Sequence, residues 1–136
     1  MGITRVFGKK ETAEKIKTIA VATILTDSDS GKSLILSAAA GVAVTLPSVA
    51  VAGFNVKVIV GSAFATTDFT IVSPTSVIQG GSIVNSVFVP ASNENTISFV
   101  ASAESIGDYV NIVSDGTNYY VDGVGALAGS VTFTAV

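Results

Sequence analysis

The residues that could do chemistry in this chain are carboxylates, hydroxyls and lysines, because its 136 residues include no histidine, cysteine or tryptophan. Without imidazole or thiol groups, a histidine base, a cysteine nucleophile and disulfides are excluded, and so are nearly all zinc and transition-metal sites. The absence of cysteine does not report the redox compartment. Any catalysis would therefore depend mainly on acidic residues.

Five acidic residues in the second half of the chain could supply the carboxylate pair of a glycoside hydrolase. They are Glu94, Glu104, Asp108, Asp115 and Asp122. Each stands next to Gly, Ser or Asn, in turn-like contexts where acids are common for backbone reasons. The chain also lacks the aromatic residues of a sugar-binding groove, with no tryptophan and three tyrosines. We therefore expect a protein that is not an enzyme and that carries no cofactor.

Two short motifs overlap near residue 30. Asp27-Ser28-Asp29-Ser30 resembles the start of a calcium loop, but Lys32 replaces the turn glycine and no bidentate glutamate follows. Ser30-Gly31-Lys32-Ser33 ends like a phosphate-binding loop, but Thr26 replaces the upstream glycine and no helical pattern follows. We interpret the segment as a turn whose side chains cap backbone N–H groups. A weak surface calcium site is the alternative.

The charges are unevenly placed along the chain. Five of the seven basic residues lie in the first 17 positions: Arg5, Lys9, Lys10, Lys15 and Lys17. Two acids in the same stretch reduce its net charge to +3. From residue 18 onward, two lysines face eight acids, which gives −6. The stretch from Lys9 to Lys17 has helix-forming composition but is too short for a stable isolated helix. We expect residues 1–19 to form a basic arm that orders on a partner, or else a solvated terminus.

The surface is expected to be poor in charge. Hydrophobic residues make up 49% of the chain and charged residues 12%, about half the usual charged fraction of roughly 25%. No segment approaches the roughly 18 uninterrupted apolar residues of a membrane span, so we expect no membrane partner. The arm has a single aromatic residue among its basic residues, Phe7, which is a weak signal for a nucleic-acid-binding segment, and we expect no nucleic acid partner. Other protein is then the best candidate to cover an apolar surface.

Short alternating segments separated by Gly, Pro, Asn and Ser continue from residue 20 to the end. Thr18 to Leu25 is interpreted as the first strand, and the segment from Ile83 to Val89 as one strand that ends at Pro90. Residues 107–123 predict a hairpin with its turn at Ser114 to Asn118. About nine or ten such strands predict one all-β domain at 20–136, an antiparallel β-sandwich of jelly-roll-like topology.

Three tyrosines lie on the predicted hairpin, at Tyr109, Tyr119 and Tyr120. Cross-strand packing with one or two rings at the rim accounts for them. The alternative is a contact patch for another subunit or for a glycan.

Several segments resemble the β-modules of tailed-bacteriophage structural proteins. A strand beginning Asp-Ser-Gly-Lys precedes one ending Val-Thr-Leu-Pro, and a Gly-Asp segment leads into Ser-Asp-Gly-Thr-Asn-Tyr-Tyr-Val, at 29–36, 41–47, 107–110 and 114–121. Segments 53–61 and 77–81 also match, so the resemblance covers roughly residues 24–122. Tyr119 stands where the family usually has tryptophan. Such modules occur in capsid decoration (cement) proteins and in head or tail fibres.

The resemblance implies a homotrimeric decoration protein on the outer surface of a phage capsid, with the major capsid protein as its partner. The residues of the basic arm (Arg5, Lys9, Lys10, Lys15 and Lys17) would then bind the capsid. The alternative is a fibre or receptor-binding module that recognises host glycans through Tyr109, Tyr119 and Tyr120.

Overall fold

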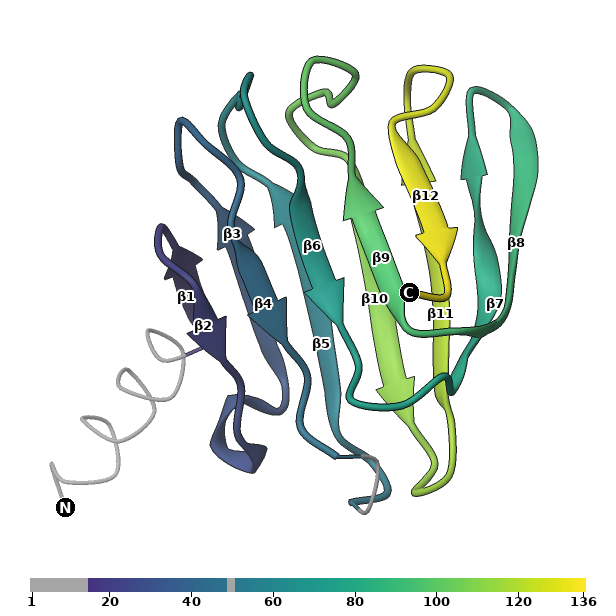
Figure 1. Cartoon of the computed structure of the whole chain (residues 1–136). Helices are drawn as coiled ribbons and strands as arrows, with labels where there is room; N and C mark the ends of the chain where they lie inside the picture. Colours follow the sequence, from purple (N-terminus) through teal and green to yellow (C-terminus); the bar gives the residue numbers. More distant parts are fainter. Residues whose placement is uncertain (1–14, 49–50) are drawn as a thin grey trace, which may run out of the picture.

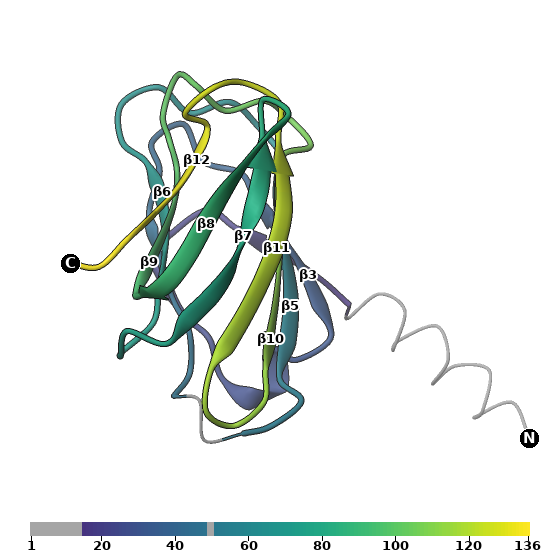
Figure 2. The same ribbon diagram turned by 90° about the vertical axis from the view of Figure 1, so that its right-hand side faces the viewer.

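The computed structural model describes residues 15–48 and 51–136, and these residues form two β-sheets packed face to face. Figures 1 and 2 show the two layers from the front and from the side. The seven-stranded sheet, sheet A, has the order β1-β3-β5-β10-β11-β7-β8. The five-stranded sheet, sheet B, has the order β12-β9-β6-β4-β2. The all-β sandwich expected from the alternating segments is therefore confirmed.

The strands of sheet A are β1 (Ile16–Ile19), β3 (Lys32–Leu36), β5 (Asn55–Val60), β7 (Ile78–Val84), β8 (Val87–Glu94), β10 (Tyr109–Ser114) and β11 (Tyr119–Gly125). Those of sheet B are β2 (Thr23–Ile24), β4 (Ala43–Thr45), β6 (Phe69–Val72), β9 (Thr96–Phe99) and β12 (Val131–Thr134). The short 3-10 helix η1 (Asp27–Asp29) links β2 to β3. No helix in these described ranges is long and apolar enough to cross a membrane.

Strand pairing is mixed, whereas antiparallel sheets were expected. From β1 to β6 the chain alternates between the two sheets and adds each strand parallel to the previous one in the same sheet (Figure 1). The remaining strands pair mostly antiparallel, with β7 and β11 the parallel exception. A jelly roll is antiparallel throughout, and this winding of β1 to β6 distinguishes the fold from one.

The core lies between the sheets and is built from the inward positions of each strand. Val56, Val58 and Val60 on β5 are buried, as their alternation with Asn55 and Lys57 predicts. The aromatic rings of Phe64 and Phe69 pack edge to face with centroids 4.9 Å apart. The predicted hairpin is also confirmed, because β10 and β11 pair antiparallel with Ser114 opposite Tyr119.

The first strands differ from the prediction. The apolar run from Thr18 to Leu25 divides into β1 in sheet A and β2 in sheet B, with Val21 in the link between them. Sheet A begins at Ile16, four residues before the expected domain boundary at residue 20. The sheet begins early because β3, which pairs with β5 on one side, takes β1 as a second parallel partner on the other. Ile16 to Ile19 pair with Ser33 to Leu36 of β3.

The segment Ile83 to Val89, expected as one strand, contains a hairpin turn. Val84 lies opposite Val87, so Asn85 and Ser86 form a two-residue loop with φ values of 49° and 65°. Positive φ at both central residues is typical of a type I′ turn. Pro90 does not end the strand, because β8 is an edge strand in which a missing N–H can be tolerated.

Replacing Ser86 with glycine is expected to stabilise the protein by about 0.5–1 kcal/mol. Glycine adopts a left-handed conformation without the steric cost that serine carries there. Denaturant unfolding of Ser86→Gly measures the change in the free energy of unfolding. Ser76→Gly is the control, because exposed Ser76 does not have positive φ, and its glycine variant should gain nothing.

Candidate functional site

The outer face of sheet A carries a continuous row of apolar side chains across six neighbouring strands. We call this set the apolar row; its members are Ile35, Ile59, Tyr109, Val124, Ile83 and Phe88. The last three are 42%, 45% and 56% exposed, and the first three are partly exposed. Each side chain points outward because its neighbours along the strand, such as Val58 and Val60, face the core.

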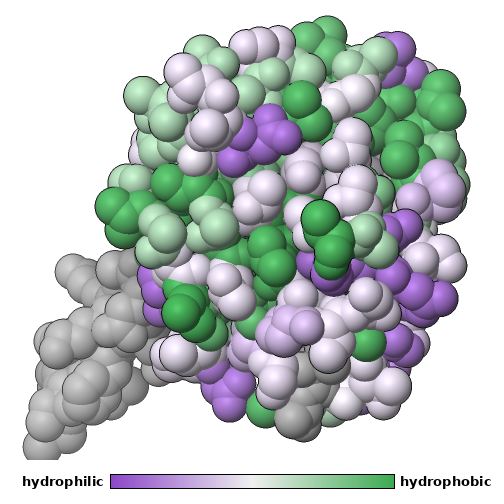
Figure 3. All heavy atoms as spheres, viewed as in Figure 1, coloured by the Kyte–Doolittle hydropathy of each residue, from purple (hydrophilic) through white to green (hydrophobic). Residues whose placement is uncertain are grey.

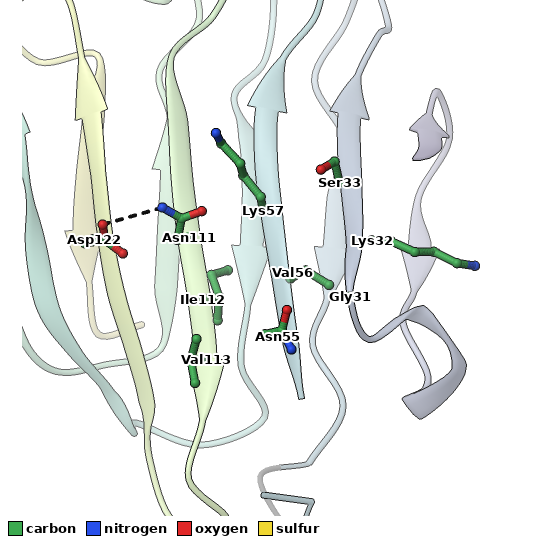
Figure 4. A pocket seen from close by; sticks show the side chains of 10 residues that line it. All are labelled: Gly31, Lys32, Ser33, Asn55, Val56, Lys57, Asn111, Ile112, Val113 and Asp122. Atoms are coloured by element: carbon green, nitrogen blue, oxygen red, sulfur yellow. Dashed lines mark hydrogen bonds between the residues drawn. The ribbon is translucent and has the colours of Figure 1, made fainter. Parts of the chain in front are cut away.

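A polar row lies two residues further along the same strands. Ser33, Lys57, Asn111 and Asp122 are register partners on β3, β5, β10 and β11. They line a shallow depression of about 340 Å³ on the outer face of sheet A (Figure 4). The Lys57 ammonium lies 4.4 Å from the centroid of the Tyr109 ring, and the Asn111 amide donates a long 3.5 Å hydrogen bond to Asp122. The depression offers the Lys57 cation, the Asp122 anion and the amides of Asn55 and Asn111 for recognition.

The outer face of sheet B is different in character. Thr70, Ser98 and Thr132 occupy one outward register. The next register alternates Ile24, which is 75% exposed, and Val72 with Thr45 and Thr96. In the space-filling view over this sheet, pale positions are mixed with separate green groups and a few purple ones (Figure 3). Hydroxyl-bearing residues interrupt the apolar positions, so the described strands of sheet B carry no continuous apolar row.

Asp29, from the calcium-like segment, is 3% exposed and accepts hydrogen bonds from three donors. Its Oδ1 atom accepts from Lys17 Nζ at 3.0 Å and from Lys32 Nζ at 3.3 Å, and its Oδ2 atom accepts from the Thr26 N–H at 3.0 Å. Burial alone would raise the pKa of this carboxyl, but the Thr26 N–H and the two ammonium groups together lower it below its usual value. The expected capped turn is confirmed.

The same contacts decide the role of Lys32. Its side chain points away from the depression (Figure 4) and reaches Asp29. Gly31-Lys32-Ser33 continues into strand β3, where a phosphate-binding loop would continue into a helix. Lys32 therefore links strand β3, on which it lies, to the η1 turn.

Replacing Asp29 with asparagine is expected to destabilise the protein by about 1–3 kcal/mol at neutral pH, because two partly buried lysines lose their anion. The pKa is lowered in the folded state, so this contribution is present above the ordinary carboxyl pKa of 3.8 and is lost as pH falls through the lower folded value. Unfolding measured from pH 7 to pH 2 should show a smaller loss of stability for Asp29→Asn than for the unmodified protein. The control is Asp27→Asn in the same turn; equal effects of the two variants would contradict this role.

The other candidate carboxylates hold loop backbone in place. Asp108, 4% exposed, accepts from the Ser105 N–H through Oδ2 and from the Ala126 N–H through Oδ1, at 2.9 and 3.0 Å. Glu104 accepts from the Phe64 N–H at 3.0 Å, and its other oxygen is buried without a partner. In the described ranges, no three His, Cys, Asp or Glu side chains gather as a metal site would require.

Asp115 has the same role at the hairpin turn. The N–H groups of Asn118 and Thr117 donate to its Oδ1 at 2.7 and 2.8 Å, and the Tyr120 hydroxyl donates to its Oδ2 at 3.0 Å. These bonds, led by that from Asn118, lower the pKa of Asp115. The carboxylate is therefore occupied by the turn that it stabilises.

The three tyrosines do not form one patch. Tyr119 is fully buried, packs edge to face on Phe54 with centroids 6.3 Å apart, and donates its hydroxyl hydrogen to the Pro47 carbonyl. Burial raises its pKa to about 12, with a further contribution from Asp27. Its predicted contact with a subunit or glycan is therefore wrong for the folded protein, since odd-numbered residues of β11 face the core.

Tyr109 and Tyr120 do lie on the outer face of sheet A. They are separated along the strands by four register positions, since Tyr109 lies opposite Val124 and Tyr120 opposite Val113. That spacing is about 13 Å. Tyr109 belongs to the apolar row, whereas Tyr120 lies two positions beyond the polar row. Two separate rings therefore remain of the three-tyrosine patch.

The basic arm is only partly described. Arg5, Lys9 and Lys10 lie outside the described residues. Lys15 is exposed at the start of sheet A, and its carbonyl accepts from the Ser33 N–H at 2.8 Å. Lys17 lies on β1 with its ammonium on Asp29. Lys17 therefore has a structural partner within the chain, in addition to the capsid-binding role expected of it.

The apolar row was missed by sequence analysis, although one signal was present. Ile59 alternates with the core residues of β5 and so had to face outward with Lys57. The row itself depends on strand order and register, which bring Ile59 beside Tyr109 and Ile83 beside Val124.

Comparison of the chain with protein-family models, with curated proteins and with solved structures gave no match.

Proposed function

We propose that this protein is a non-enzymatic structural protein of a tailed-phage virion that decorates and stabilises the outer surface of the capsid. The observation that carries the proposal is the apolar row, an exposed apolar strip on a face with few charges. Exposed continuous apolar surface marks protein–protein contact sites. The resemblance of segments 29–47 and 107–121 to phage β-modules supplies the class of partner.

The arrangement of the acidic residues supports a structural role. Asp29, Glu104, Asp108 and Asp115 all accept hydrogen bonds from loop backbone. A carboxylate held in this way stiffens a loop between strands. A decoration protein needs this property, because rigid partners lose less conformational entropy when they bind.

The basic arm would tie the sandwich to the acidic outer surface of the capsid lattice. Arg5, Lys9, Lys10 and Lys15 precede β1 and Lys17 lies on it. The residues from 18 onward carry a net charge of −6. The arm thus contacts an acidic surface that the body would repel. Bound protein that bridges neighbouring capsomers favours the assembled shell by mass action.

Deletion of the coding sequence from the phage tests the proposal. Particles without the protein are expected to lose their DNA at a lower temperature than complete particles. Purified full-length protein should bind these particles and restore their heat resistance. Particles that show unchanged heat resistance and bind none of the added protein would overturn the proposal.

A truncated protein tests the arm separately. A variant consisting of residues 15–136 keeps Lys15, whose carbonyl bonds to β3, and is expected to fold. It should bind the depleted capsids at least tenfold more weakly, and the loss should shrink as salt rises. Equal binding by the truncated and the complete protein would contradict the role of the arm.

A further inference from the structure

We propose that the outer face of sheet A binds the same face of a second copy. The two copies are related by a two-fold axis that lies between the two faces and runs parallel to β10. The inference assigns the apolar row to a second copy of the chain, so that the basic arm is the part left to contact the capsid. It does not depend on the capsid role, because the pairing is a property of the purified chain.

Strand β10 lies at the middle of sheet A. It is flanked by β5 and β11, then by β3 and β7, and then by β1 and β8. A two-fold rotation about this axis, directly above β10, places β5 of one copy over β11 of the other, and β3 over β7. A twisted sheet has a saddle shape that maps onto itself under this rotation, so the two faces follow each other across their width.

The apolar row is self-complementary under this rotation. Ile59 faces Val124 of the second copy, and Ile35 faces Ile83, since these residues occupy equivalent positions on either side of β10. Tyr109 lies on the axis and faces its own counterpart. Every member of the apolar row from β3 to β7 therefore meets another member of the row, as an isologous interface requires.

The polar row is complementary in charge. Lys57 on β5 and Asp122 on β11 flank Asn111 in the same register. The rotation brings Lys57 of one copy opposite Asp122 of the other, so that two ion pairs form across the interface. Asn111 lies on the axis opposite itself (Figure 4 shows the three side chains in line). Wrong registers would place like charges or apolar groups against these residues.

The size of the face is sufficient for a modest dimer. Seven strands about 4.8 Å apart and about six residues long cover roughly 30 by 20 Å. Two such faces bury about 1,200 Å², the lower end of the range for specific interfaces. The resemblance implies a trimer, which needs two different surfaces on each copy, whereas this face complements itself.

Charge exchange tests the pairing in solution. Lys57→Asp and Asp122→Lys each place like charges across the axis, and each should raise the dimer dissociation constant at least tenfold in sedimentation equilibrium. The double variant Lys57→Asp/Asp122→Lys restores opposite charges and should return to within about threefold of the unmodified protein. A monomer or a trimer of the unmodified protein, or a double variant as weak as the single variants, would overturn the proposal.

Cross-linking tests the position of the axis. The chain has no cysteine, so Asn111→Cys places a single thiol beside its own counterpart. A short bifunctional maleimide should link this variant into dimers in high yield. Ser98→Cys, on the outer face of sheet B, is the matched control and should link poorly. Equal yields from the two variants would contradict this geometry.

Capsid binding by a strictly monomeric protein would refute the pairing and leave the proposed function standing.

Discussion

Replacing Tyr119 with alanine is expected to lower the free energy of unfolding by about 3–5 kcal/mol, the usual cost of deleting a buried aromatic ring. The substitution removes the edge-to-face contact with Phe54 and leaves the Pro47 carbonyl without its donor. Tyr120→Ala, on the adjacent residue, should cost much less, because Tyr120 is 46% exposed. Denaturant unfolding of the two variants measures the difference. A similar small cost for both would contradict the burial of Tyr119.

The alkaline limit of stability gives a second measurement on the same residue. Burial raises the pKa of Tyr119 from 10.0 to about 12, so the neutral phenol is favoured in the folded protein. This contribution is complete below pH 10 and is lost as pH rises through about 12. Tyr119→Phe keeps the ring and removes the ionisable hydroxyl. It should therefore lose less stability than the unmodified protein over this interval, and Tyr120→Phe serves as the control.

Replacing Asp108 with alanine is expected to cost about 2–4 kcal/mol, because the Ser105 and Ala126 N–H groups lose the buried carboxylate that accepts their hydrogen bonds. The carboxylate joins its own loop at Ser105 to Ala126, which lies 18 residues after Asp108 in the sequence. Asp115→Ala is the comparison, since Asp115 holds only its own exposed turn. Thermal unfolding of both variants should rank Asp108 well above Asp115. The reverse order would contradict the assignment of Asp108 as a link between loops.

The class of fold could be predicted from alternation alone. Val56, Val58 and Val60 recur at every second position, and that period is sufficient to assign a half-buried strand. Strand direction could not be predicted, because parallel and antiparallel strands share the same period. The winding from β1 to β6 therefore became visible only in three dimensions.

The hairpin turn at Asn85 and Ser86 shows a second limit. Asparagine followed by glycine is the strong signal for such a turn, and serine in the second position masks it. The continuous apolar run from Ile83 to Val89 then reads as one strand.

The candidate site could be predicted only in its general character. The low fraction of charged residues indicated a surface covered by other protein, and the structure places much exposed apolar surface on one face. The specific residues required long-range register, as in the alignment of Val124 with Ile83. Asp29 required the same information, since Lys17 reaches this η1 residue from strand β1.

Cryo-electron microscopy of the intact virion that carries this protein tests the central proposal most directly. We expect density for the two-layered sandwich on the outer surface of the capsid, in contact with neighbouring capsomers and with its N-terminal side toward the shell. Density confined to the tail or its fibres, or purified particles without this protein, would contradict the account.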